Sequence, residues 1–155
     1  MDEPVERYRL LMADVYELAG LSRRISGREA AAHGATSAQW QILSVMDEVP
    51  ATVPQIARRL GLTRQAVQRV VNELLEAGHV RRLPEDRALR SPRIEPTPSG
   101  RQSLAELWQA TLPRRRQALV DAGIDGDDLD AARVTVGRLI EALRESERAR
   151  ASGAG

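Results

Sequence analysis

The chain has 155 residues, 42% hydrophobic and 29% charged, a balance that predicts one soluble domain with appended helices. It contains no cysteine, which excludes disulfides, a cysteine nucleophile, a thiol redox sensor and thiolate metal sites. His33 and His79 lie far apart without ligand spacing, and no apolar run reaches the ~18 residues of a membrane span. We therefore expect a cytoplasmic protein without a metal or cofactor.

The net charge of +1 is unevenly distributed along the chain. Residues 1–51 carry −3 (five Arg against eight acidic residues) and residues 52–100 carry +4 (nine Arg against five). Residues 101–155 carry nine of each. A local basic region is typical of phosphate binding, whatever the total charge.

The N-terminal region, residues 1–35, is predicted to be mainly one helix over residues 4–33. Gly20 and Gly27 weaken its middle, which allows a bend or a break there. The predicted helix has a wide apolar stripe that consists of Tyr8, Leu11, Met12, Val15, Leu18 and Ala19.

Helices with clear start signals follow. Two Thr-x-x-Gln capping boxes predict helix starts: Thr36 with Gln39, and Thr52 with Gln55. Gly61 is typical of a helix end, and Thr63 is a good N-cap for the next helix. Two helices joined by so short a turn form a helix-turn-helix.

The second helix of this pair, residues 63–75, has two unlike faces. One is an apolar stripe of Val67, Val70, Val71 and Leu74. The opposite face has hydrogen-bond donors and no carboxylate before Glu73: Arg64, Gln65, Gln68, Arg69 and Asn72. Arginine can pair with guanine and glutamine with adenine, so this face suits the major groove of DNA. The alternative is an ordinary solvated face.

Residues 79–83 and 93–95 read as two strands joined by a turn-rich segment, which together predict a wing. Arg87 and Arg90 lie nearest its predicted tip, where we expect them to contact DNA. Pro96 has no N–H to donate and therefore marks a strand end or a free edge.

Residues 101–148 are predicted to form further helices, and residues 149–155 a disordered tail. A helix opens at Thr97-Pro98, and Pro113 is expected to kink or break it. The last helix begins at Asp125 and has a stripe of Val136, Leu139, Ile140 and Leu143. The apolar stripes of the N-terminal and last helices need other apolar surfaces to pack against, which a second copy of the chain would supply. Packing of these helices on each other is the alternative.

Residues 36–100 resemble the winged helix-turn-helix of the multiple-antibiotic-resistance-regulator (MarR) family of bacterial transcription factors. Four short motifs carry this resemblance. No single one of them is specific for the family, but their order and spacing together are. The motifs are Thr36 to Gln39-Trp40, Ala57-Arg58-Arg59-Leu60-Gly61-Leu62, Gly78-His79-Val80-Arg81-Arg82 and Thr97-Pro98-Ser99-Gly100. The chain departs from the family pattern in the wing, at Ala88, where aspartate is common, and at Pro96, where leucine is usual.

The resemblance implies a mainly α fold with a small β wing, flanked by N- and C-terminal dimerisation helices, in a homodimer that binds double-stranded DNA. By position, base-reading residues would be Arg64, Gln65 and Gln68. Phosphate-contacting residues would be Thr52, Thr63 and Arg69, and Arg90 would be the wing-tip arginine. Many relatives release DNA when a small aromatic or phenolic ligand enters a cleft. Residues that could line such a cleft here are His33, Trp40, Met46, Arg23 and Arg24.

The sequence thus predicts a transcriptional regulator, more often a repressor in this family, that binds a pseudo-palindromic operator. The alternative is a winged helix that binds protein. Such a face should have exposed aromatic or aliphatic anchors, and the helix over residues 63–75 has none on its polar side. An enzyme is not indicated, because the sequence contains no nucleophile–base motif and no Gly-rich phosphate loop.

Overall fold

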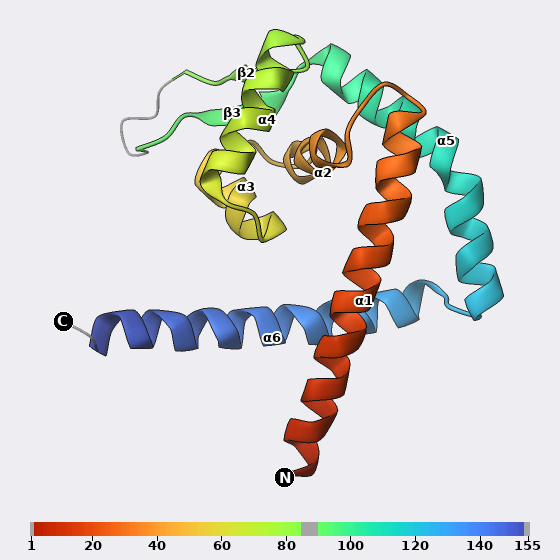
Figure 1. Cartoon of the computed structure of the whole chain (residues 1–155), viewed down its shortest axis with the longest axis vertical. Helices are drawn as coiled ribbons and strands as arrows, with labels where there is room; N and C mark the ends of the chain where they lie inside the picture. The colour runs from red at the N-terminus through yellow and green to blue at the C-terminus, as the bar shows by residue number, and fades with distance from the viewer. Residues whose placement is uncertain (1, 85–89, 154–155) are drawn as a thin grey trace. The chain divides into compact units, whose positions relative to one another are not determined.

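The structure, a computed structural model, describes residues 2–84 and 90–153. It is mainly helical with a small antiparallel sheet, as predicted (Figure 1). The chain divides into two compact units, Met1–Thr111 and Leu112–Gly155. The elements in chain order are α1 Glu3–Ala31, α2 Ser37–Met46, β1 Ala51–Thr52, α3 Val53–Leu60, α4 Arg64–Glu76, β2 Val80–Arg82, β3 Arg93–Pro96, α5 Pro98–Ala122 and α6 Gly126–Gly153.

Helix α1 is uninterrupted over its 29 residues, so the break allowed at Gly20 or Gly27 does not occur. A glycine costs a helix interior only about 1 kcal/mol relative to alanine, which the long flanking helical segments can offset. The predicted capping boxes both form. Gln39 N donates to Thr36 Oγ1 over 3.1 Å, and Gln55 N donates to Thr52 Oγ1 over 3.3 Å.

The hydrophobic core of the first unit is built on α2, α3 and α4. Side chains from these three helices are fully or almost fully buried, together with residues of the sheet and of α5: Trp40, Ile42, Met46, Ile56, Val67, Val71, Leu74, Val80, Ile94, Leu104 and Leu107. The ring of Trp40 also meets that of Trp108 edge to face, with centroids 5.5 Å apart. Trp40 is therefore an anchor of this core.

The sheet has three strands in the order β1-β3-β2. The predicted hairpin forms, with Arg81 opposite Glu95 and Val80 opposite Pro96. Strand β1 was not expected, because its two residues have no alternating pattern; it pairs Ala51 with Ile94 on the other edge of β3. Pro96 is the last residue of β3 and lies beyond the segment that pairs with β1, so its missing N–H breaks no ladder bond to that strand.

The Thr97-Pro98-Ser99-Gly100 motif fixes the start of α5 against the end of α4. Thr97 Oγ1 donates to Gly78 O over 2.6 Å and accepts from Gly100 N over 3.1 Å. Thr97 N donates to His79 O over 3.0 Å. A Cβ at position 100 would lie 1.9 Å from that same carbonyl oxygen of His79. The close approach of two backbones therefore requires glycine here.

We expect Gly100→Ala to lower the free energy of unfolding by about 1–3 kcal/mol or more, because backbone atoms must move to admit the methyl group. Gly27→Ala is the matched control. Its new Cβ would meet nothing closer than Ser37 Cβ at 3.9 Å, and alanine should stabilise α1 by up to about 1 kcal/mol. Thermal and urea unfolding followed by circular dichroism measure both changes. Equal stability of the two variants would contradict the proposed backbone clash.

In the second unit, the structure departs from two predictions in part. Helix α5 continues through Pro113 to Ala122 without a break. Proline removes one backbone donor there, and the long helical segments on either side keep the remaining bonds. Helix α6 extends to Gly153, so residues 149–153, predicted as a disordered tail, are helical. Arginine, glutamate and alanine are frequent before this point, and all three are good helix formers.

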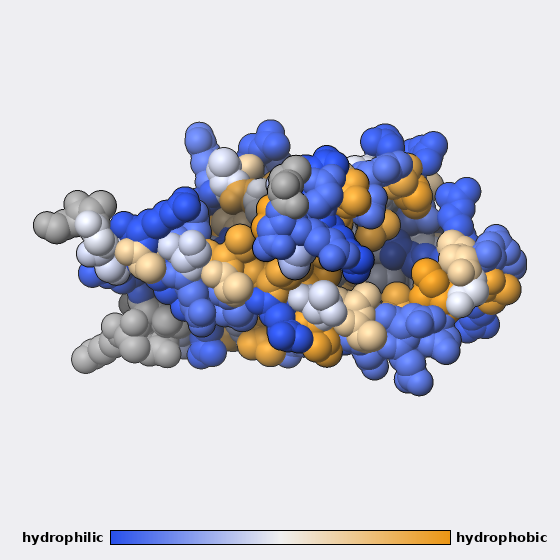
Figure 2. Space-filling view, turned by 90° about the horizontal axis from the view of Figure 1, so that it is seen from below, coloured by the Kyte–Doolittle hydropathy of each residue, from blue (hydrophilic) through white to orange (hydrophobic). Residues whose placement is uncertain are grey.

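Helix α6 begins with a reciprocal cap between Asp125 and Asp128. Asp125 Oδ1 accepts from Asp128 N over 2.9 Å, and Asp128 Oδ2 accepts from Asp125 N over 3.1 Å. None of its residues is buried in the single chain. Its exposed apolar side chains include Leu129, Val134, Val136 and Leu143. Figure 2 shows hydrophobic side chains at the surface on one face of the molecule.

Candidate nucleic-acid interface

Helix α4 is positioned by a tight turn and by its own apolar stripe. Gly61 adopts the left-handed conformation at φ 65°, and Leu62 N donates to Ala57 O over 2.9 Å to close α3. Thr63 Oγ1 then caps α4 by accepting from Ala66 N over 3.1 Å. The predicted stripe of Val67, Val70, Val71 and Leu74 is buried, with at most 5% of each residue exposed. The opposite face of α4 is thereby turned to solvent.

The exposed face of α4 is rich in donors, as the sequence predicts. Its side chains are Arg64, Gln65, Gln68, Arg69 and Asn72. Gln68 Nε2 donates to Asn72 Oδ1 over 2.9 Å, one helical turn away. The first carboxylate, Glu73, accepts from Gln39 Nε2 of α2 over 3.3 Å. No large hydrophobic side chain is exposed on α4, all of whose residues the structure describes. A protein-binding face would need such an anchor.

Thr52 does not belong to this exposed surface. Only 6% of the residue is exposed, and its hydroxyl caps α3. It also pairs with Arg93 in the sheet. The phosphate contact expected for Thr52 is therefore not supported, because its side chain is committed to the fold. Thr63, by contrast, is both a cap and exposed.

The wing presents arginines beside α4. Arg82, Arg90 and Arg93 are exposed. Arg81 is exposed as well, but its Nε donates to Glu95 Oε1 over 2.7 Å across the hairpin, which offsets its charge locally. Arg87, expected at the tip, and Ala88, where the family pattern is interrupted, lie outside the described residues. Arg90 follows directly after that gap.

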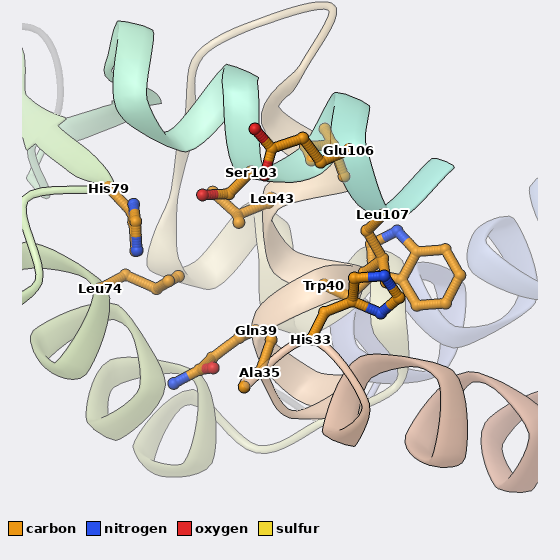
Figure 3. A pocket seen from close by; sticks show the side chains of 12 residues that line it. His33, Ala35, Gln39, Trp40, Leu43, Leu74, His79, Ser103, Glu106 and Leu107 are labelled. Atoms are coloured by element: carbon orange, nitrogen blue, oxygen red, sulfur yellow. The ribbon is translucent and has the colours of Figure 1, made fainter. Parts of the chain in front are cut away.

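A pocket of about 170 Å³ lies behind α4, between the end of α1 and helices α2, α4 and α5 (Figure 3). It brings together two of the five residues expected to line a ligand cleft, His33 and Trp40. Met46 is instead fully buried in the core. Arg23 and Arg24 are exposed on α1 and do not line this pocket.

Several pocket residues were not predicted as such from the sequence. They are Gly34, Ala35, Gln39, Leu43, Leu74, His79, Ser103, Leu104, Glu106 and Leu107. His79 Nδ1 lies 3.3 Å from Ser99 Oγ at the start of α5. For Gln39 the sequence offered one indication of a place near the pocket: it directly precedes Trp40 in the motif that starts at Thr36. The others meet only through tertiary packing, which spacing along the chain does not reveal.

Other kinds of site find no support in the described part of the chain. Among residues 2–84 and 90–153, no three His, Asp or Glu side chains are grouped so that they could hold a metal ion. Within the same residues, none of the helices has the length and apolar character needed to cross a bilayer.

Comparisons with known proteins agree with this geometry. Residues 33–91 match the model of the MarR family. The uncharacterized protein Rv2011c of Mycobacterium tuberculosis is 44% identical over 136 residues, which cover 86% of this chain and 92% of that protein. The transcriptional activatory protein BadR of Rhodopseudomonas palustris is 28% identical over 104 residues, 64% of this chain and 59% of that protein.

The fold is also that of solved regulators. The structure of the transcriptional regulator BldR from Sulfolobus solfataricus matches with a TM-score of 0.74 at 23% identity, over 89% of this chain and 99% of that one. A MarR family transcriptional regulator from Silicibacter pomeroyi also matches with a TM-score of 0.74, at 19% identity, over 92% and 95% of the two chains. The chain belongs to the MarR family of winged-helix transcriptional regulators.

Proposed function

We propose that the chain is a ligand-responsive repressor that acts in the cytoplasm and binds a pseudo-palindromic operator as a homodimer. The observation that carries the proposal is the exposed face of α4. It combines arginine and glutamine donors with no exposed apolar anchor and no acidic residue in its first turn. Such a face suits base edges in the major groove better than a protein surface.

On DNA, Arg64, Gln65 and Gln68 would read bases, and each good bidentate pair would discriminate by roughly 1–3 kcal/mol. Thr63 and Arg69 lie beside them and would contact phosphates. Among the wing arginines, Arg90 is the one we expect in the adjacent minor groove. These contacts would fix the register of the helix in the groove.

The exposed helix α6 supports the homodimer. A 28-residue helix without a buried residue, but with exposed leucines and valines, calls for a partner surface. Two-fold symmetry would place two copies of α4 in successive major grooves, with half-sites about 34 Å apart. The operator should therefore be pseudo-palindromic.

The pocket supports a small aromatic or phenolic ligand. An engineered apolar cavity of about 150 Å³ accommodates benzene, so about 170 Å³ allows one substituted ring. Trp40 and four leucines supply apolar walls, while His33 and His79 supply polar nitrogen atoms. Leu74 brings α4 itself into the wall. A ligand here could release DNA only if it binds the released conformation more tightly.

Footprinting and gel shifts over the intergenic region upstream of the chain's own gene test DNA binding. We expect a protected pseudo-palindrome whose affinity falls about 10³-fold or more between 50 and 200 mM salt, because phosphate contacts release counterions. A duplex of the same composition in scrambled order is the control. Binding that is absent, or that ignores salt and sequence, would contradict the proposal.

The name of the BadR relative makes an activator the second candidate. Both regulators would bind DNA through α4, so the footprint cannot separate them. A transcriptional reporter driven by the protected promoter does. Deletion of the regulator should raise reporter expression for a repressor and lower it for an activator.

A further inference from the structure

The side-chain amide of Gln39 connects three parts of the first unit. Its Oε1 accepts from Thr36 N over 3.0 Å and so completes the cap of α2. Its Nε2 donates to Glu73 Oε2 of α4 over 3.3 Å. The same side chain lines the pocket (Figure 3). One planar group thus takes part in a helix cap, a link to α4 and the wall of a cavity.

The link reaches α4 beside the point where that helix meets the pocket. Glu73 is followed by Leu74, which is a lining residue and 2% exposed. In Figure 3 the amide end of Gln39 lies on the same side of the pocket as Leu74 and His79. The polar link and the apolar contact therefore act on consecutive residues of α4.

We propose that Gln39 is a positioning residue that couples occupancy of the pocket to the placement of α4, through its bond to Glu73. The inference rests on the proposed ligand-responsive DNA binding and assigns its transmission to one hydrogen bond. With the pocket empty, the bond holds the end of α4 against α2. A ring in the pocket that turns the amide breaks this bond, because the same planar group cannot keep both bonds after rotation.

The coupling follows from differential binding. DNA selects the arrangement in which Glu73 is held, and the ligand selects the one in which the amide is turned into the pocket. Each ligand then weakens the binding of the other by the same factor. No contact between the small molecule and the DNA-reading side chains Arg64 and Gln68 is required.

Gln39→Glu separates the link from the cap. Glutamate fills the same capping-box position and still offers an oxygen to Thr36 N. It has no donor for Glu73, and the two carboxylates repel each other. Combining it with Glu73→Gln restores a donor–acceptor pair with the roles exchanged. The double variant also has the net charge of the unmodified chain.

Pocket occupancy can be imposed without knowing the natural ligand. Ser103 lines the pocket and is half-buried, so Ser103→Phe places one aromatic ring in it. Phenol, a one-ring probe, does the same in the unmodified chain should this variant fail to fold, which circular dichroism would show. The readout is the ratio of operator Kd with the pocket filled to that with it empty.

We expect a ratio of about ten in the unmodified chain, about one in Gln39→Glu, and about ten again in the double variant. A purely structural role, or a simple charge effect on DNA binding, would change the Kd values and leave the ratio as it was. A ratio of one in the unmodified chain, a ratio of ten in Gln39→Glu, or no recovery in the double variant would each overturn the proposal.

Hydrogen exchange without DNA makes the result independent of the proposed operator. Filling the pocket should speed amide exchange in peptides that cover α4 in the unmodified chain and in the double variant, but not further in Gln39→Glu. If α4 responds in this way while no duplex binds, the coupling stands and the DNA-binding proposal fails. If the operator binds while α4 exchange ignores the pocket, the coupling alone fails.

Discussion

The double variant Arg64→Ala with Gln68→Ala should abolish sequence-specific binding to the proposed operator and leave the proposed dimer intact; this is the largest effect we expect from any surface substitution. Both side chains are exposed on the same face of α4 and contribute nothing to the core. If each reads a base, the loss is about 2–6 kcal/mol, or roughly 30- to 10⁴-fold in Kd. Fluorescence anisotropy with the footprinted operator measures it.

The fold should survive this change, since alanine is a strong helix former and no buried group loses a partner. Among residues 2–84 and 90–153, the hydrogen bond that the change removes is the exposed one between Gln68 and Asn72. Arg150→Ala with Gln102→Ala is the matched control. It removes the same two residue types, and Gln102 makes a comparable bond one helical turn along, to Glu106 over 2.9 Å. Operator binding by the Arg64/Gln68 variant at the control's affinity would mean that α4 is not the reading helix.

The parts of the fold that the sequence predicts best are those decided locally. The capping boxes at Thr36 and Thr52 form because both partners lie within four residues of each other. The buried stripe of α4 follows from helical periodicity alone. For the same reason the donor-rich face of this helix could be recognised before the structure was known.

Predictions that depend on tertiary context were less secure. Thr52 matches a phosphate-contacting position in the motif, yet strand β1 and the α3 cap bury it. From the sequence, both Met46 and Trp40 are candidates to line a ligand cleft, but only Trp40 lines the pocket. At Pro113 the expected break does not occur, because an otherwise favourable helical sequence outweighs a single missing donor.

The role of Gln39 shows the same limit. Its capping bond could be predicted from spacing, whereas its link to Glu73 joins residues 34 positions apart. The pocket likewise combines Leu43 of α2 with Ser103–Leu107 of α5, which lie 60 or more residues further along the chain. The regulatory proposal therefore rests on contacts between residues that are far apart in the sequence. The DNA-binding proposal rests on features of α4 that neighbouring residues determine.

Removal of α6 by a stop after Gly123 should convert the proposed dimer into unstable or monomeric protein. The helix buries none of its residues in the single chain, so its apolar side chains must be covered elsewhere. Each Leu, Ile or Val that becomes fully buried contributes about 1.5–3 kcal/mol. The side chains at stake are exposed or half-buried: Leu129, Val134, Val136, Leu139, Ile140 and Leu143. Their combined contribution is comparable with the stability of a typical domain.

A stop after Arg148 is the matched control, because it removes the end of α6 but keeps every one of those apolar residues. Sedimentation and thermal unfolding should find this shorter truncation dimeric and as stable as the full chain. The shorter truncation should bind the operator as tightly as the full chain, and the protein without α6 should bind it more weakly. A monomer contacts only one half-site and loses the second set of contacts. A stable, operator-binding dimer that lacks all of α6 would show that α1 or α5 alone holds the two copies together. The apolar face of α6 would then need another partner.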